Sequence, residues 1–277
     1  MASTEAKKNK NGSVKSHAMY DEIVSDKEHV SNEEAGEREA KADEPEVSVV
    51  IPVYNEVGII TSSVEDLVAA LRDMEWSFEL ILSENGSSDA TFELAKNLEA
   101  RFEEVRAVTT GEPNYGKALR LGIMMARGKF VLCDEIDLCD TRFYRNAMAI
   151  LRQDSADMVV GSKLLAGAND SRGWFRNSAS KVLNNMLHHL VGFQGTDTHG
   201  LKAFRRDRLL RVVESCLVDK DLFTSELVIR AERLVRVTEI PLEVIEKRRP
   251  SINLVRRVPN VLKNMGRLVW IFRIRGE

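Results

Sequence analysis

Four acidic residues stand close together in the segment VLCDEIDLCD at residues 131–140. Carboxylates packed side by side without a cation repel one another, and some of them must then bind protons. The segment opens as an apolar run typical of a buried strand, in which residues i and i+2 project to the same side. We therefore expect Glu135 and Asp137 to converge on one point, whereas Asp134 turns away.

Two converging carboxylates predict a site for Mg²⁺ or Mn²⁺, which prefers oxygen ligands and takes the remaining ones from phosphates. A structural interpretation competes with this one. Acidic residues also gather at strand ends for structural reasons, and Asp140 or Thr141 can cap the helix that is expected to follow. The spacing alone does not decide between the two interpretations.

A sheet must position these residues, and the sequence from residue 47 onward has the pattern of one. Short β-branched runs alternate with amphipathic helical segments, and the runs are apolar almost throughout, as in parallel strands covered on both faces. Repeated strand, helix, strand units predict an α/β fold with a doubly wound, mostly parallel sheet flanked by helices. The expected strands are residues 47–54, 78–85, 105–110, 129–136 and 156–163, and the expected helices include residues 62–73, 89–102 and 115–126.

Ligands of such sheets bind at the carboxyl ends of the strands, so the residues that follow each strand are candidate site residues. The first strand ends in IPVYNE, which places Pro52, Tyr54 and Glu56 at this edge. The second strand ends in SENGSSDAT, which adds Glu84 and Asn85. The fourth strand ends in the acidic segment.

Composition and cysteine usage set the broad class. With 277 residues and a net charge of −3, the chain is long enough for one large globular domain or two small ones. Its three cysteines form no CxxC pair, which argues against a zinc site and indicates a reducing compartment. Neither a membrane-spanning apolar stretch nor the apolar core of a signal peptide is visible. We expect a cytoplasmic protein, either free or peripheral on the cytoplasmic face of a membrane.

The two ends of the chain differ from the middle. Residues 1–46 are polar and carry few apolar side chains, so we expect a disordered tail. Residues 250–277 interleave Arg and Lys with apolar residues including Trp270 and Phe272, which predicts a basic amphipathic C-terminal helix at an anionic membrane surface. Packing of this helix on the domain, or a contact with a partner, is the alternative. No nucleic-acid-reading module accompanies the basic run, so no nucleic acid is expected as a partner.

The chain carries in this order the segments IPVYNE, ENGSSDAT, NYGKALRLG, ARGKFVLCDEIDL and DMVVGSK. Together these five segments resemble the family 2 glycosyltransferases, and the resemblance covers residues 47–249. It implies a GT-A domain, Rossmann-like in fold, that binds a nucleotide sugar. The second half is most similar to the dolichyl- and polyprenyl-phosphate sugar synthases, through GSK, GWFRNSAS, TDTHGLKAFRRD, LFTSELVIRAERL and VTEIPLEVIEKR.

The resemblance also implies roles for particular positions. The family's DxD motif, which ligates the metal bridging the diphosphate, falls on Glu135 and Asp137 with Ile136 between them. This chain has Glu-Ile-Asp where the family has DxD, and ENGS where the family has DDGS. The first departure affects the geometry of the metal site, and the second affects the specificity for the base. The positions implied for the base and ribose are Pro52, Tyr54, Glu56, Glu84 and Asn85, and those implied for acceptor and donor phosphates are Lys163, Arg176 and Lys247.

The expected mechanism follows from where charge develops. Glycosyl transfer creates a negative nucleoside diphosphate leaving group, which a divalent cation held by Glu135 and Asp137 stabilises. Lys117 and Lys163 add positive charge near the same phosphates. A lipid phosphate is already an anion at neutral pH, whereas a sugar hydroxyl needs a base. Asp197 is the candidate base or acceptor-orienting group, and its alternative role is that of a loop residue bonding backbone amides.

Three hypotheses result. The first is a metal-dependent glycosyltransferase, inverting by resemblance, that moves a sugar from a GDP- or UDP-linked donor to a polyprenyl or dolichyl phosphate. The second keeps the nucleotide sugar and transfers the sugar to a saccharide or a small-molecule hydroxyl. The third is a nucleotide-sugar-binding protein that has lost catalysis.

Overall fold

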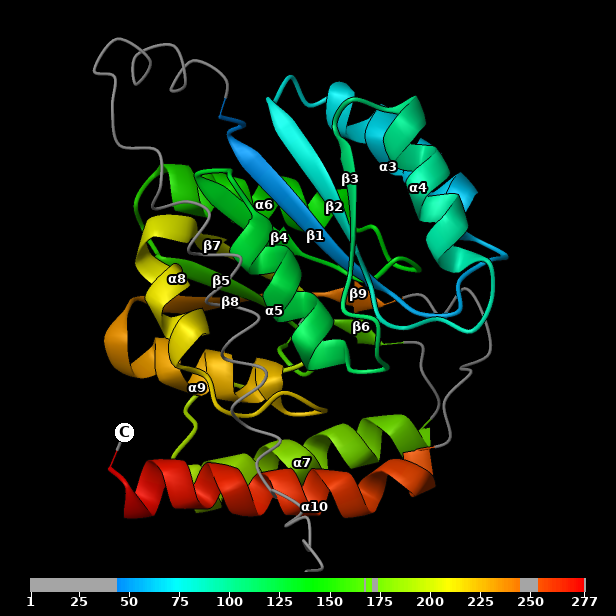
Figure 1. The fold of residues 1–277 in the computed structure, drawn as a ribbon. Helices are drawn as coiled ribbons and strands as arrows, with labels where there is room; N and C mark the ends of the chain where they lie inside the picture. The colour runs from blue at the N-terminus through cyan, green and yellow to red at the C-terminus, as the bar shows by residue number, and fades with distance from the viewer. Residues whose placement is uncertain (1–43, 167, 171–173, 245–253, 277) are drawn as a thin grey trace, which may run out of the picture. The chain divides into compact units, whose positions relative to one another are not determined.

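A seven-stranded sheet forms the centre of the fold, with strand order β3-β2-β1-β4-β7-β5-β8 (Figure 1). The computed structural model describes residues 44–166, 168–170, 174–244 and 254–276. Neighbouring strands are parallel except that β7 runs antiparallel to both β4 and β5. The strands are β1 (Val47–Val53), β2 (Phe78–Glu84), β3 (Val105–Thr109), β4 (Phe130–Cys133), β5 (Met158–Ser162), β7 (Lys202–Arg205) and β8 (Val237–Pro241), and β6 (Asn169–Asp170) pairs separately with β9 (Glu243–Val244).

The strand order contains a topological switch point between β1 and β4. The chain builds outward from β1 through β2 to β3, and then returns to place β4 on the other side of β1. The chain therefore leaves β1 toward β2 on one side of the sheet and leaves β4 toward β5 on the other, so the loops after these two neighbouring strands separate. In open α/β sheets this arrangement leaves the crevice in which ligands bind.

Helices cover both faces of the sheet (Figure 1). Buried side chains of α3, α4 and α6 form one hydrophobic cluster with the sheet, and those of α5, α7, α8, α9 and α10 form a second cluster on the other face. The helices are α3 (Ile60–Arg72), α4 (Thr91–Arg101), α5 (Tyr115–Met125), α6 (Thr141–Arg152), α7 (Trp174–Val191), α8 (Arg206–Ser215), α9 (Phe223–Leu234) and α10 (Leu254–Val269), and the π-helical turn η1 (Trp270–Ile274) continues α10.

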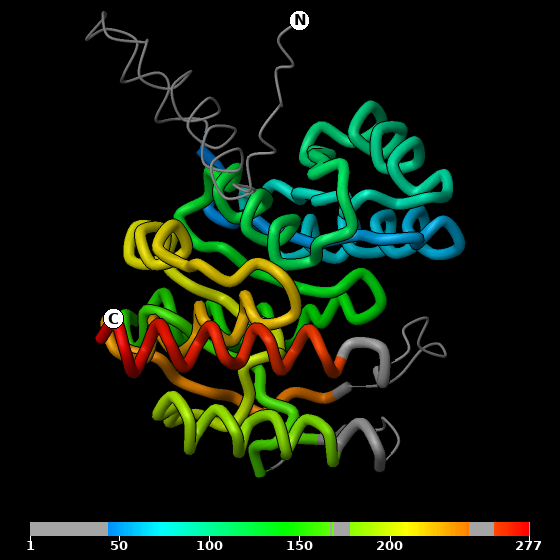
Figure 2. The backbone as a smooth tube through the Cα atoms, turned by 60° about the horizontal axis from the view of Figure 1, so that its bottom comes forward, coloured from blue at the N-terminus to red at the C-terminus, as the bar shows by residue number. Residues whose placement is uncertain are grey.

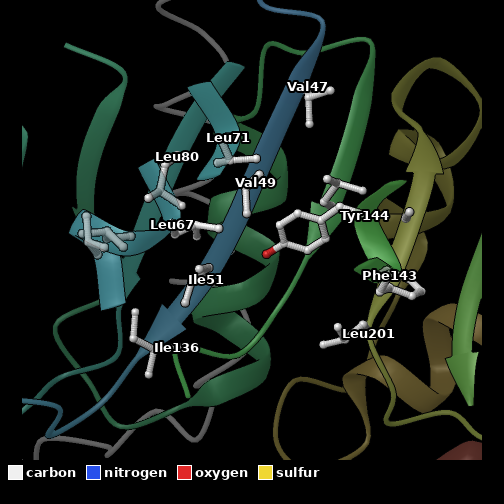
Figure 3. Packing of buried hydrophobic residues seen from close by; sticks show 14 of the residues in the cluster. Val47, Val49, Ile51, Leu67, Leu71, Leu80, Ile136, Phe143, Tyr144 and Leu201 are labelled. Carbon is white, nitrogen blue, oxygen red and sulfur yellow. The ribbon is translucent and has the colours of Figure 1, made fainter. Parts of the chain in front are cut away.

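Alternation along β1 explains how one strand serves both clusters. Val49 and Ile51 belong to the cluster that includes α3 and α6 (Figure 3). Tyr144 of α6 and Ile136 of the turn after β4 belong to the same cluster. Val50, one residue out of phase, belongs to the opposite cluster. Every residue of β1 is buried, as in a parallel strand covered on both sides.

The five strands and three helices expected from the sequence are confirmed, with ends that differ by a few residues. The largest difference is at β4, which ends at Cys133 and not at residue 136. Residues 136–138 form a turn, in which the N–H groups of Leu138 and Cys139 donate to the carbonyl of Glu135 at 2.9 and 3.3 Å. The expected strand spacing therefore does not apply to Glu135 and Asp137.

The C-terminal basic segment forms α10, which lies beside α7 (Figures 1 and 2). Met265, Leu268 and Phe272 are buried in the cluster that α9 also joins, so one face of the segment packs on the domain. None of the described helices combines the length and hydrophobicity needed to cross a bilayer. Residues 1–43, which make up most of the expected tail, lie outside the described part of the chain.

Candidate active site

Hydrogen bonds join the loop after β1 to the loop after β2. The Asn55 side-chain oxygen accepts the N–H of Ser88 at 2.9 Å, and the Asn55 N–H donates to Ser87 Oγ at 3.0 Å. Asn55 has a positive φ of 54°, which asparagine tolerates better than most residues. Tyr54 beside it is exposed, whereas Pro52 is buried within β1. The two strand ends singled out in the sequence thus lie together.

Glu84 and Asn85 are buried, and their side chains accept backbone N–H groups of nearby loops. The Glu84 carboxylate accepts the Thr109 hydroxyl at 2.6 Å and the N–H of Ser87. Burial alone would raise the pKa of Glu84, but these hydrogen bonds outweigh burial and lower it. The Asn85 side-chain oxygen accepts the N–H of Asn114, the residue that caps α5. Both side chains therefore fix the loops that surround the switch point.

Gly86 is required in the turn that follows. Its φ of +67° is unfavourable for residues with a Cβ, and an added Cβ would lie 2.5 Å from the carbonyl carbon of Glu112. Glu112 lies on the loop between β3 and α5 and forms an ion pair with Lys117, which stands in the first turn of α5. Lys117 is thus presented beside the loop that follows β2.

The acidic turn follows β4 at the switch point. Ile136 is buried in the core, close to the carboxyl end of β1 (Figure 3). Of the two acids that flank it, Glu135 is exposed and Asp137 is half-buried. The buried isoleucine between them anchors a turn and not a strand. Asp140 caps α6 by accepting the N–H groups of Arg142 and Phe143 at 3.0 Å, so the structural interpretation holds for this acid.

Asp134 occupies an enclosed position below this turn. Its carboxylate accepts the N–H of Glu135 at 2.6 Å, the N–H of Asp140 at 3.0 Å and the hydroxyl of Tyr144. Burial raises the pKa of Asp134 to about 7, although these hydrogen bonds act in the opposite direction. The expectation that Asp134 turns away from Glu135 and Asp137 is consistent with this burial.

A second group of predicted residues meets after β5. The Asp197 carboxylate accepts the backbone N–H of Lys163 at 3.2 Å and lies 3.8 Å from its ammonium group. Its other oxygen accepts the N–H of His199 at 2.8 Å. Burial would raise the pKa of Asp197, but the Lys163 charge and these N–H groups outweigh burial and lower it. Asp197 therefore bonds loop amides, and it also holds a lysine.

Two charged residues that the sequence analysis left without a role support this loop. Glu239 on β8 accepts the N–H groups of Thr196 and Asp197 at 2.7 and 3.2 Å. Lys202 is buried at the start of β7, opposite Cys133 of β4, and donates to the carbonyl of Gly200 at 2.7 Å. Burial lowers the pKa of Lys202 to about 8. No local pattern in the sequence signals this burial, because it depends on the place of β7 between β4 and β5.

Two predicted phosphate ligands are not fully described. Arg176 lies in the first turn of α7, and its side chain is outside the described atoms. Lys247 belongs to the segment of residues 245–253, which is also outside the described part of the chain. Their role in phosphate binding stays a prediction.

The donor set at the acidic turn fits a divalent cation. Glu135 and Asp137 offer carboxylate oxygens, the ligand type that Mg²⁺ and Mn²⁺ prefer. Within the described residues, no cluster of three or more His, Cys, Asp or Glu side chains is arranged as a metal site. Two protein carboxylates leave coordination positions for water and phosphate oxygens, as nucleotide-bound magnesium requires.

The sequence profile of Glycosyl transferase family 2 matches residues 48–213, from β1 into α8. The chain belongs to this family. The matched region includes both linked loops, the acidic turn and the Lys163–Asp197 pair. The family predicted from the sequence is thereby confirmed.

Curated relatives share part of their length with this chain. Glycosyltransferase AglD of Haloferax volcanii is 27% identical over 236 residues, covering 83% of this chain and 38% of the relative. The undecaprenyl-phosphate 4-deoxy-4-formamido-L-arabinose transferase of Proteus mirabilis is 34% identical over 167 residues, covering 58% of this chain and 49% of the relative. The chain thus spans less than half the length of both relatives.

Solved structures agree with the fold. Glucosyl-3-phosphoglycerate synthase from Mycobacterium tuberculosis, in complex with Mn²⁺, UDP and glucosyl-3-phosphoglycerate, superposes with a TM-score of 0.57 at 20% identity. The superposition covers 87% of this chain and 85% of that one. This likeness confirms the expected α/β architecture and its helix-flanked, mostly parallel sheet.

Proposed function

We propose that this family 2 glycosyltransferase domain uses a divalent metal ion to move a sugar, with inversion, from a GDP- or UDP-linked donor to a polyprenyl or dolichyl phosphate. The observation that carries the proposal is the position of Glu135 and Asp137 on the turn after β4, at the switch point beside β1, whose following loop holds the Asn55–Ser88 contact. Similarity to an enzyme named for undecaprenyl phosphate supports the acceptor class. The inverting stereochemistry rests on the family resemblance alone.

The donor is assigned to the loops that follow β1 and β2. Tyr54 is exposed there and offers a ring to the base. The Glu56 N–H donates to the Thr91 hydroxyl, and the Asn85 side-chain oxygen accepts the N–H of Asn114. The Glu84 carboxylate keeps the Ser87 turn in place. Pro52 acts from inside β1 by fixing the direction in which the chain leaves the sheet.

The leaving diphosphate is assigned to the acidic turn. Glu135 and Asp137 would hold a Mg²⁺ or Mn²⁺ ion, which supplies positive charge to the leaving group when bound. Lys117 in the first turn of α5 and Lys163 after β5 bring further positive charge from the chain itself. Charge fixed in position before the reaction stabilises the leaving group without the cost of reorganisation.

The state of Asp197 favours a phosphate acceptor over a hydroxyl. A general base must bind a proton, yet the pKa of Asp197 lies below its ordinary value and both its oxygens accept backbone N–H groups. An anionic phosphate acceptor needs no base but does need a cation. Lys163, held by Asp197, is suited to bind that anion, and Arg176 and Lys247 are the further candidates.

We assign the membrane contact to α10 and α7. Both helices carry exposed apolar side chains, including Val182 on α7 and Val258, Leu262 and Trp270 on α10 and η1. Arg267 and other basic residues alternate with them. Apolar groups flanked by basic ones suit an anionic lipid surface, where a polyprenyl phosphate resides.

A donor panel tests the proposal directly. Purified protein is heated with UDP- and GDP-linked sugars, with and without Mn²⁺, because a bound donor stabilises the fold by mass action. The stabilising donor is then incubated with undecaprenyl or dolichyl phosphate, and with free sugars as hydroxyl acceptors. Metal-dependent transfer to the lipid phosphate is expected. Transfer only to hydroxyls, or donor binding without any transfer, would overturn the proposal.

A further inference from the structure

A single buried carboxylate closes the loop that carries the two proposed metal ligands. Asp134 Oδ1 accepts the N–H of Glu135 at 2.6 Å, where the loop begins. Asp134 Oδ2 accepts the N–H of Asp140 at 3.0 Å, where the loop ends and α6 starts. One side chain thus ties together both ends of the segment that contains Glu135 and Asp137.

A tyrosine fixes this carboxylate to the core. The Tyr144 hydroxyl, on the first turn of α6, donates to Asp134 Oδ2. Its ring is fully buried in the same cluster as Val49 and Ile51 of β1 (Figure 3). Because the ring cannot shift without disturbing close packing, the carboxylate takes its position from the core.

Two more features hold the loop to one shape. Ile136 is 3% exposed and anchors the middle of the turn in the core. Cys139 has a φ of +47°, a conformation that a non-glycine residue keeps only when its surroundings enforce it. The Cys139 N–H donates to the carbonyl of Glu135 at 3.3 Å. The backbone of the acidic turn is therefore fixed at its start, middle and end.

From these contacts we infer that Asp134 and Tyr144 are positioning residues for the metal: they orient Glu135 and Asp137 without touching the ion. The inference rests on the proposed metal role of those two acids. Burying a carboxyl group is unfavourable unless it is hydrogen-bonded, and an apolar side chain would end β4 equally well. The buried carboxylate of Asp134 is therefore explained better by the loop that it holds than by the end of the strand. A small octahedral ion such as Mg²⁺ demands close to ideal ligand directions, and residues that orient its ligands influence affinity strongly.

Conservative variants separate this role from general stability. Tyr144→Phe removes one hydroxyl, and Asp134→Asn keeps the side-chain shape while replacing one acceptor oxygen by a donor. Ser48→Ala is the matched control, because Ser48 is equally buried and lies at the opposite end of β1. The substitution removes the hydrogen bond that the Ser48 hydroxyl donates to Glu79 and the one that it accepts from the Gly128 N–H. Binding of Mn²⁺ is measured by the electron paramagnetic resonance signal of the free ion, with UDP or GDP present. Thermal unfolding and circular dichroism verify that each variant folds.

We expect both loop variants to bind Mn²⁺ about tenfold more weakly than the wild type, while Ser48→Ala binds as the wild type does. The Mn²⁺ concentration for half-maximal turnover shifts by the same factor. If folded Tyr144→Phe and Asp134→Asn bind Mn²⁺ like the wild type, or if Ser48→Ala weakens it equally, the inference is wrong although the proposed function stands. If the wild type itself binds no Mn²⁺ with either nucleotide, the metal role and this inference fall together.

Discussion

The ammonium group of Lys163 lies 3.8 Å from the carboxylate of Asp197, and the same carboxylate accepts the backbone N–H of Lys163 at 3.2 Å. The two residues are 34 positions apart in sequence and stand on loops after β5 and before β7. The lysine side chain is 10% exposed and the aspartate side chain 3%. A cation held this way keeps a fixed direction at the edge of the site, which suits binding of an anionic acceptor.

Replacing the lysine tests that assignment. Lys163→Met keeps the length of the side chain and removes its charge, so the KM for the lipid phosphate should rise about tenfold, as expected for loss of a hydrogen bond to a charged group. The KM for the nucleotide sugar should change less. Steady-state kinetics with each substrate varied in turn measure both quantities. Lys96→Met, an exposed lysine on α4, is the matched control. An equal rise in both KM values would assign Lys163 to the donor.

Much of this site was predictable from the sequence, because its residues follow apolar, β-branched runs whose own composition favours strands. The expected strands at residues 47–54 and 78–85 end within one residue of the observed ones. β4 ends earlier than predicted, because the Asp134 side chain accepts the N–H of Glu135 and the chain then turns at residues 136–138. No local pattern reports that a distant tyrosine binds that aspartate.

The antiparallel strand was also beyond local reasoning. β7 has four residues, KAFR, and its place between β4 and β5 depends on pairing with both neighbours. The buried position of Lys202 follows from that placement. A lysine is normally expected to be exposed, so its burial becomes visible only once the sheet order is known.

The buried Lys202 should make the free energy of unfolding depend on pH, and its shifted pKa gives the direction of that dependence. Burial lowers its pKa from 10.5 to about 8 in the folded protein. Between these values the unfolded chain binds more protons than the folded one, so the free energy of unfolding should rise with pH over this window. The total rise is on the order of 3 kcal/mol at most. Urea unfolding between pH 7 and 10.5 measures it.

Lys202→Met should remove this rise, while Lys96→Met at an exposed position should retain it. The comparison is made on the difference in unfolding free energy between variant and wild type at each pH, so that other titrating groups cancel. A difference that stays constant from pH 7 to 10.5 would show that Lys202 titrates as it does in the unfolded chain.

The apolar residues exposed on α10 predict binding to anionic vesicles. Val258 and Leu262 are 50% and 54% exposed, and a Val258→Ser, Leu262→Ser variant removes apolar surface without touching the buried face. Sedimentation with phosphatidylglycerol vesicles should weaken about tenfold. Leu234→Ser, which alters an exposed leucine at the end of α9, is the control. Binding should also fall with salt, because basic residues contribute to it. Equal sedimentation of variant and wild type contradicts a lipid-facing α10.

The strongest effect on catalysis is expected at the acidic turn itself. Glu135→Gln and Asp137→Asn preserve size and remove the charge that a divalent ion requires, so each should lower kcat about 100-fold or more, since a metal contributes several kcal/mol to stabilising the leaving group. Asp66→Asn, which alters an exposed acid on the separate helix α3, should leave kcat unchanged.

Because Glu135 is exposed and Asp137 is half-buried, these substitutions should leave the fold intact and shift the melting temperature little. Loss of turnover then reflects the site and not unfolding. Excess Mn²⁺ should partly restore Glu135→Gln, in which Asp137 remains as a charged ligand, and should fail to restore a variant that carries both changes. Wild-type turnover in that double variant would exclude a metal at this turn, and the positive charge at the leaving diphosphate would then have to come from Lys117 and Lys163.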